Sequence, residues 1–169
     1  MPIRIERARA QDAAELRGLL VRVWKESFGS FLSEQALAEV SKRWHDEDLI
    51  ARQIADPEVF FARAGSEEGL LGLVTLRCTG AQEAFLHRLY VAPGTRSRGV
   101  GDLLLSAALS AFPGIRSVRL EVLEDNKKAI KFYERHGFRP AGRRTEPLGE
   151  AGELRLLEMI KDAEGPARA

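Results

Sequence analysis

The segment from residue 85 to residue 111 constrains the fold most, because a strand, a glycine-bearing turn and a helix follow one another there. Apolar residues over 85–91 predict a central strand, and the turn carries Gly99 and Gly101. Glycines let a backbone approach a ligand, and the first amides of a helix have no intrahelical acceptor. The turn therefore predicts an anion-binding site at a helix start. Apolar positions at helical spacing define that helix before Pro113-Gly114 ends it: Val100, Leu104, Ala107, Ala108 and Ala111.

Two common nucleotide-binding patterns do not fit this turn. No Gly-Lys-Ser/Thr sequence provides a phosphate-binding P-loop, and Leu104 stands where a dinucleotide fingerprint needs a third glycine. Arg96 and Arg98 are compatible with a phosphate ligand. Glycine turns at helix starts also occur without a ligand, so a second signal is needed.

The second signal is a helix that follows the strand predicted at 118–122. Asn126 is a suitable N-cap, and Gly137 suits a left-handed helix end before the apolar Phe138. Residues on one face of this predicted helix are one or two turns apart: Ala129, Ile130, Tyr133 and His136.

Both segments resemble characteristic motifs of the GNAT acetyltransferases. Residues 96–101, Arg-Ser-Arg-Gly-Val-Gly, resemble motif A, usually written Gln/Arg-x-x-Gly-x-Gly/Ala. Residues 126–138 resemble motif B, in which Asn-x-x-Ala-x-x-x-Tyr is followed by Gly-Phe. The resemblance covers residues 85–138, and the flanking segments agree in the order of their elements.

The resemblance implies the GNAT fold, an α+β architecture layered α/β/α. Its sheet is mixed and mostly antiparallel, and its central parallel strand pair is splayed. The chain length suits one domain, expected over residues 1–161, with a frayed tail over 162–169. Predicted strands cover 3–7, 59–64, 70–76, 85–91, 118–122, 140–145 and 154–159, and helices are expected near 11–23, 33–44, 46–55, 100–111 and 126–136.

The resemblance also implies acetyl-CoA as co-substrate. In the family the pantetheine arm enters the gap between the splayed strands, where backbone groups of Leu89 and Val91 would pair with its amides. The amides from Arg98 to Leu103 would hold the pyrophosphate. The complete set of residues expected to bind the cofactor is Leu89, Tyr90, Val91, Arg96, Ser97, Arg98, Gly99, Val100, Gly101, Asp102, Leu103, Asn126 and Tyr133.

Tyr133 and His87 are the expected catalytic residues. Tyr133 matches the general-acid tyrosine of the family, and its alternative role is a core aromatic beside Phe132. Many family members carry a glutamate on the central strand where this chain has His87. Strand alternation places His87 on the side of Phe85, Leu89 and Val91, and histidine is a competent base. A solvent-facing histidine is the alternative, with Glu83 and Glu121 as substitute bases.

Asp102 is unexpected directly after the second glycine, and it is interpreted as complementing the helix dipole with its carboxylate turned away. The expected acceptor is a small cationic or polyamine-like amine, because residues 23–28 resemble the polyamine-acetylating branch of the family. Peptide or protein amines, and a non-catalytic acetyl-CoA sensor, remain alternatives. Trp24, Phe28 and Phe31 are expected in the core. Acidic residues that could bind a cationic amine occur in the same region of the sequence: Glu26, Glu34, Glu39, Asp46, Glu47 and Asp48.

Composition argues against several other classes. A net charge of +1 with no basic run interleaved with aromatics gives no reason to expect nucleic acid. The single Cys78 forms no internal disulfide, and His45, His87 and His136 lack metal-ligand spacing, so no metal is expected. Without a signal sequence or a long apolar run, a cytoplasmic protein with no membrane contact is expected. An exposed edge strand would permit a homodimer.

Overall fold

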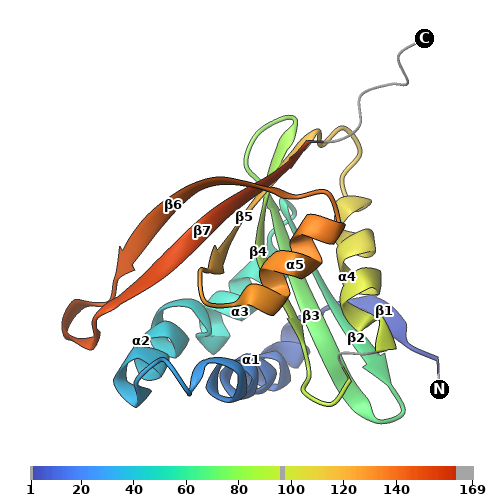
Figure 1. Cartoon of the computed structure of the whole chain (residues 1–169). Coiled ribbons are helices and arrows are strands. Elements are labelled where there is room, and N and C mark those ends of the chain that lie inside the picture. Colours follow the sequence, from blue (N-terminus) through green and yellow to red (C-terminus); the bar gives the residue numbers. More distant parts are fainter. Residues whose placement is uncertain (1, 96–97, 163–169) are drawn as a thin grey trace.

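The computed structural model describes residues 2–95 and 98–162, and within them seven strands form one mixed sheet (Figure 1). The strand order is β1-β2-β3-β4-β5-β7-β6. Only β4 and β5 are parallel among the described neighbours. The strands are β1 (Arg4–Arg7), β2 (Val59–Ser66), β3 (Gly69–Cys78), β4 (Glu83–Val91), β5 (Ser117–Leu123), β6 (Arg139–Pro147) and β7 (Glu153–Asp162).

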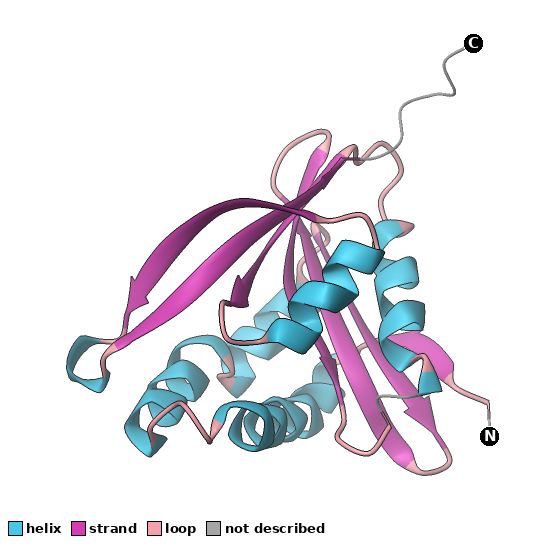
Figure 2. Cartoon of the chain, viewed as in Figure 1, coloured by secondary structure: helices cyan, strands magenta, loops and turns pink. Residues whose placement is uncertain are grey.

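Helices cover both faces of the sheet (Figure 2). One face carries α1 (Ala13–Phe28), α2 (Glu34–Trp44) and α3 (Glu47–Ala55), and the other carries α4 (Val100–Leu109) and α5 (Lys127–Arg135). Two short 3-10 helices, η1 (Ala10–Asp12) and η3 (Gly149–Ala151), complete the described elements. This layered arrangement with one parallel pair confirms the predicted fold class.

Strand alternation divides the core into two layers. Phe60 on β2 packs with Leu104 and Leu105 of α4, whereas the next residue, Phe61, packs with Leu20 of α1 on the opposite face. β2 and β3 are buried on both faces, so their apolar runs are nearly continuous. The centre of the sheet is therefore held between both helical layers.

The helix starts follow the capping residues in the sequence. Ser33 accepts a hydrogen bond from Ala36 N at 3.0 Å, and Asp46 accepts one from Leu49 N at 3.1 Å. Gly137 has φ +88° and follows α5, as expected for a left-handed helix end. The predicted elements and their order are confirmed, with bounds that differ by a few residues.

The C-terminal end of the sheet is longer than expected. Asp162 pairs with Ser117 in the register of β7 and β5, and its carboxylate lies 3.0 Å from Arg139 Nη2. Residues 163–169 of the predicted tail lie outside the described residues. Across the described part of the chain, no helix is long and apolar enough to cross a membrane. No group of three metal-ligating side chains comes together in that same part.

Candidate active site at the splayed strands

The central parallel strands pair only at one end. Register pairs run from Glu83 with Ser117 to Leu86 with Leu120, and none follows. Beyond that point β4 and β5 diverge (Figure 1). The divergence leaves one side of residues 87–91 of β4 without a neighbouring strand.

The backbone of Leu89 and Val91 faces this gap. Ala92 N donates to Leu71 O at 2.7 Å, so the backbone of Ala92 is directed toward β3. Backbone groups of alternate residues in a strand point to the same side, which directs Tyr90 toward β3 and Leu89 and Val91 toward the gap. An extended ligand with amide groups can therefore pair with β4 as an added strand would.

The glycine turn leads into α4 as predicted. Gly99 is the N-cap, and its φ of +74° is a left-handed conformation that favours glycine. Leu103 N donates to Gly99 O at 3.1 Å, which begins the helical ladder. Amides earlier in the turn precede that ladder and suit an anion. Arg98 is exposed and lies 2.5 Å from Glu68, while Arg96 and Ser97 lie outside the described residues.

Gly101 has a packing role besides any role in ligand approach. A Cβ atom at this position would lie 3.4 Å from two ring atoms of Phe132 and 3.7 Å from Val91. The missing side chain thus lets α4 approach α5 and β4 closely. The sequence pattern alone does not separate this packing role from ligand binding.

Asp102 pairs with a residue that the sequence pattern does not connect to it. Its carboxylate lies 2.7 Å from His136 Nε2, and the His136 ring lies 4.5 Å from the ring of Phe132. Lys161 Nζ donates to the backbone carbonyl of His136. The available sequence signal was the position of His136 one turn after Phe132, at the end of α5.

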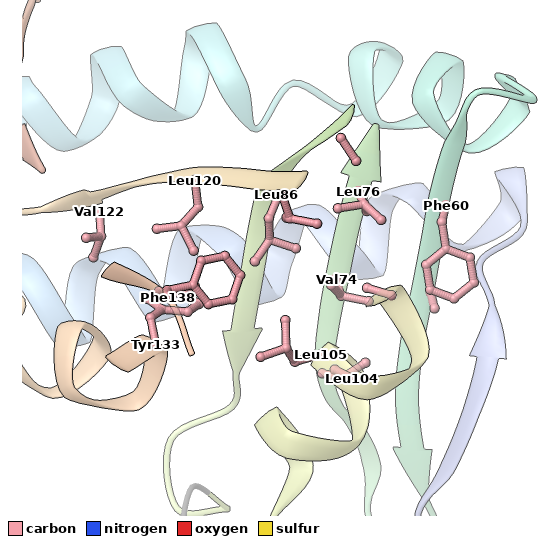
Figure 3. Packing of buried hydrophobic residues seen from close by; sticks show 14 of the residues in the cluster. Phe60, Val74, Leu76, Leu86, Leu104, Leu105, Leu120, Val122, Tyr133 and Phe138 are labelled. Carbon is pink, nitrogen blue, oxygen red and sulfur yellow. The ribbon is translucent and has the colours of Figure 1, made fainter. Parts of the chain in front are cut away.

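Tyr133 is buried where α5 packs on the face of the sheet that also carries α4. Figure 3 shows its ring close to Phe138 and below Leu120 and Val122 of β5. The ring centroids of Tyr133 and Phe138 are 5.6 Å apart. Burial raises the pKa of Tyr133, and the neighbouring Tyr90 hydroxyl raises this pKa further. Tyr133 therefore stays protonated and can act as a donor at neutral and mildly alkaline pH.

Asn126 caps α5, which was one of its two expected roles. Its side-chain oxygen accepts a hydrogen bond from Ala129 N at 3.3 Å. The side-chain amide also carries two donors that this bond does not use. Capping therefore leaves Asn126 able to contact a cofactor.

A β-bulge in β4 changes the expected orientation of His87. The register shifts between the pairs Thr75–Arg88 and Leu76–Leu86, so His87 is the extra residue. Leu86 and Leu89 both pack toward α4, although they are three residues apart. The His87 ring instead contacts Phe85, with centroids 4.8 Å apart. The prediction that His87 shares a side with Leu89 and Val91 is therefore wrong.

His87 follows the last β4–β5 pair, at the start of the splay. Desolvation, together with the charges of Arg88 and Arg77, lowers the pKa of His87 to about 4. His87 is nevertheless an exposed residue, in agreement with the alternative of a solvent-facing histidine. His87 is neutral at pH 7 and can accept a proton, as a weaker base than ordinary histidine.

Glu121 and Glu83, the alternative bases, differ in their position relative to the gap between β4 and β5. Glu121 lies on β5 one residue beyond the last parallel pair, but Arg144 Nε is 2.6 Å from its carboxylate. Glu83 begins β4 at the paired end, away from the splay. His87 and Glu121 thus each lie one residue beyond the last parallel pair, and the ion pair with Arg144 distinguishes Glu121 from His87.

The opposite side of the splay is covered by α1, α2 and the β6–β7 arm. Trp24 and Phe28 are buried there as predicted, with ring centroids 4.7 Å apart. Phe31 is 43% exposed, so its prediction as a core residue is wrong. Several acids have local roles, since Asp46 caps α3 and Glu39 pairs with Arg43 at 2.7 Å. The others are exposed: Glu26, Glu34, Glu47 and Asp48.

Comparison with known proteins agrees with this geometry. The sequence profile of the Acetyltransferase (GNAT) family matches residues 20–138. The chain belongs to the GNAT family. This acetyltransferase uses acetyl-CoA, and it was identified correctly from motifs A and B.

Relatives of this GNAT acetyltransferase match nearly its whole length. The peptidyl-lysine N-acetyltransferase YjaB of Salmonella typhimurium is 28% identical over 164 residues, which cover 95% of this chain and 99% of that protein. The apo solution structure of Escherichia coli YjaB gives a TM-score of 0.69 at 28% identity, covering 97% of this chain and 100% of that one. The PaiA N-acetyltransferase of Thermoplasma acidophilum, solved with coenzyme A, gives a TM-score of 0.81 at 22% identity, with 96% and 99% coverage, and so shares the fold.

The described residues of this GNAT acetyltransferase fit the cofactor. A free edge of β4 faces the gap, and the turn before α4 has a left-handed glycine at the helix start. The first feature suits the amides of a pantetheine arm, and the second suits a pyrophosphate.

Proposed function

We propose that this acetyltransferase transfers an acetyl group to a primary amine by direct attack, at the gap between β4 and β5. The end of the β4–β5 pairing is the observation that supports the proposal, because His87 and Tyr133 both belong to elements that border it. Pairing ends at Leu86, His87 follows it, and Tyr133 packs under β5 from the other face. A donor and an acceptor of protons are thus available near the same gap.

The cofactor would be held by the backbone of Leu89 and Val91 and by the amides of the turn before α4. When bound, acetyl-CoA supplies an acyl thioester. The Asn126 side chain, which caps α5 through its oxygen, has free amide donors for the same ligand. The Asp102 carboxylate lies against His136 at the start of α4, so it opposes anion binding less than a carboxylate without that partner would.

Proton movement sets the chemistry required of the side chains. An alkylamine with a pKa of about 10.4 is neutral in about one molecule in 2,500 at pH 7, which costs roughly 4.6 kcal/mol. Neutral His87 accepts the proton of the attacking amine at its imidazole, directly or through water. Protonated Tyr133 donates from its hydroxyl to the departing sulfur.

Two acceptor classes are compatible with this chemistry. A small cationic or polyamine-like amine is expected from the sequence of residues 23–28. The lysine side chain of a peptide or protein is supported by the similarity to YjaB, which extends over 99% of that relative. The local roles and exposure of the acids on α2 and α3 weaken the argument for a polyamine.

The proposal is tested by coenzyme A release from acetyl-CoA with polyamines, amino acids, aminoglycosides and lysine peptides. Acetyl-CoA binding is measured by calorimetry on the same preparation. Amine-dependent release supports the proposal. Tight binding without release for every amine would favour the sensor, and absence of both would contradict the assigned cofactor site.

A further inference from the structure

Two buried polar atoms on the side of the sheet that carries α1 and α2 have no hydrogen-bond partner within the described residues. They are Trp24 Nε1 and His45 Nδ1, and their residues are 9% and 2% exposed. The two rings lie side by side, with centroids 5.5 Å apart. An unsatisfied buried donor or acceptor costs about 1–3 kcal/mol. A polar group from outside the described chain is therefore expected to reach them.

The position of this pair connects it to the active site. Trp24 lies on α1 in a cluster with Leu123 of β5 and Leu154 of β7. Tyr90, on the splayed half of β4, packs against this cluster, and its ring centroid is 6.3 Å from that of Trp24. Cofactor contacts are expected from the neighbouring residues of the same strand. The pair thus lies beside the gap, on the face opposite α4 and α5.

The Tyr90 hydroxyl is a polar neighbour of the Trp24 N–H group. Burial raises the pKa of Tyr90, and the Trp24 N–H group and the Arg88 charge partly offset that rise. The Tyr90 hydroxyl is near enough to interact with the Trp24 N–H group but lies outside full hydrogen-bond geometry, so a better-placed acceptor atom can displace it.

The local charge is positive. Arg88 is only 6% exposed, and it donates to Trp44 O at 2.5 Å and Gln53 Oε1 at 2.6 Å. No carboxylate lies within ion-pair distance of Arg88 in residues 2–95 and 98–162. Burial lowers the pKa of His45 to about 3, with Arg88 and Arg17 contributing. His45 is therefore neutral, and the surrounding charge favours an electron-rich oxygen over a second ammonium group.

We infer that Trp24 Nε1 and His45 Nδ1 form the end of the acceptor pocket and bind a carbonyl or carboxylate oxygen of the substrate amine. This inference rests on the proposed function and names its acceptor class. An indole N–H only donates, so it requires an acceptor atom, and His45 also donates in the tautomer with its proton on Nδ1. Protonated polyamines carry only donors and do not satisfy the Trp24 N–H group. The acceptor is thus an amine with a carbonyl or carboxylate group, such as a lysine derivative.

Three acceptors with the same alkylamine end test the inference. They are 1,5-diaminopentane, which has no oxygen, free lysine, which has a carboxylate, and Nα-acetyl-lysine N-methylamide, which has peptide carbonyls. We expect kcat/KM for at least one lysine compound to exceed that for diaminopentane by about tenfold or more, equivalent to one hydrogen bond. A preference for free lysine would indicate that the pocket binds a carboxylate, and a preference for the N-methylamide would indicate that it binds a peptide carbonyl.

Trp24→Phe keeps an aromatic ring and removes the N–H group. It should reduce the preference for the lysine compound about tenfold, with little effect on diaminopentane. Trp44→Phe is the matched control, because the Trp44 side chain contacts Arg43 and is not part of the pair. Equal turnover of all three acceptors by wild type, or an equal loss for all three in Trp24→Phe, would overturn the inference.

A second readout does not depend on turnover. The chain has two tryptophans, so its two indole N–H resonances in a ¹⁵N-labelled sample can be assigned with Trp24→Phe and Trp44→Phe. With coenzyme A present, the preferred lysine compound should shift the Trp24 resonance downfield, whereas diaminopentane should not. If no acceptor changes the chemical shift of the Trp24 N–H group, a fixed water or the Tyr90 hydroxyl already accepts its hydrogen bond, and the inference is overturned. If the resonance shifts but no coenzyme A is released, the pocket is supported and the proposed transfer fails.

Discussion

The Asp102 carboxylate lies 2.7 Å from His136 Nε2 and thereby links the first turn of α4 to the end of α5. Phe132 of α5 packs beside this contact. Its ring is 4.5 Å from the ring of His136 and fills the space beside Gly101 of α4. The turn expected to bind pyrophosphate is therefore supported by α5, which also carries Tyr133. The proposed pyrophosphate turn and Tyr133, the proposed general acid, thus share one structural support.

The pairing of Asp102 with His136 predicts non-additive effects on cofactor affinity. Asp102→Asn removes a negative charge at the start of α4, so coenzyme A should bind about threefold more tightly at low salt. His136→Gln should weaken binding by a similar factor, because Asp102 loses its partner. In the Asp102→Asn background the second substitution should have little effect. Calorimetry of the four proteins tests this, with Glu134→Gln as an exposed control; equal effects of His136→Gln in both backgrounds would contradict it.

Substitution of His87 should affect turnover more than binding. His87→Ala should lower kcat by about 10²-fold, because the amine loses its proton acceptor, with coenzyme A affinity unchanged. The lowered pKa of His87 places any acid limb of kcat near pH 4 instead of 6.5. Glu121→Gln and Glu83→Gln are the comparison variants in steady-state assays. Full turnover by His87→Ala with a large loss in Glu121→Gln would assign the base to Glu121.

Alanine substitutions at Gly72 and Gly18 should change the free energy of unfolding in opposite directions. A Cβ on Gly72 would lie 2.7 Å from Tyr90 O and 2.9 Å from Leu104 Cδ1, so Gly72→Ala should lower the free energy of unfolding by about 1–3 kcal/mol. Gly18 is in the middle of α1, and a Cβ atom there would have no neighbour within 4 Å, so Gly18→Ala should raise that free energy by about 0.5–1 kcal/mol. Urea unfolding measures both. A Gly72→Ala protein as stable as wild type would show that β3 and α4 are packed less closely than these distances require.

His45 should make stability depend on pH. Its pKa is about 3 in the folded protein and 6.5 when unfolded, so below pH 6.5 the unfolded chain binds more protons. Stability contributed by neutral His45 is complete above pH 6.5 and is lost as pH falls toward 3, by about 1.4 kcal/mol per pH unit. The unfolding free energy of His45→Gln should therefore fall less steeply over this range. Parallel curves for the two proteins would contradict the buried, neutral state of His45.

Local sequence patterns predicted the elements and much of the candidate site. The cap at Asn126 and the place of Tyr133 on the buried face of α5 were predicted because capping and helical spacing act within a few residues. Their cofactor-binding and catalytic roles come from the resemblance to motif B and stay predictions. The position of Gly99 before α4 was found for the same reason, since a left-handed turn at a helix start depends on local backbone geometry.

Features that depend on distant residues could not be predicted in this way. The β-bulge at His87 follows from the register of β4 on β3, which alternation along one strand does not contain. Asp102 and His136 are 34 residues apart, and they meet because α4 and α5 pack on the same face. Likewise, the missing partners of Trp24 and His45 became visible only when α1 and α2 were placed on the sheet.

The most direct test of the central claim is amine-dependent coenzyme A release by wild type and Tyr133→Phe across a range of pH. Phenylalanine retains the packing of Tyr133 against Phe138 and removes only the hydroxyl. If the gap between β4 and β5 is the site of acetyl transfer, the variant should bind coenzyme A normally and lose about 10²-fold in kcat. Full turnover by Tyr133→Phe at every pH would contradict the assignment of Tyr133 as the general acid.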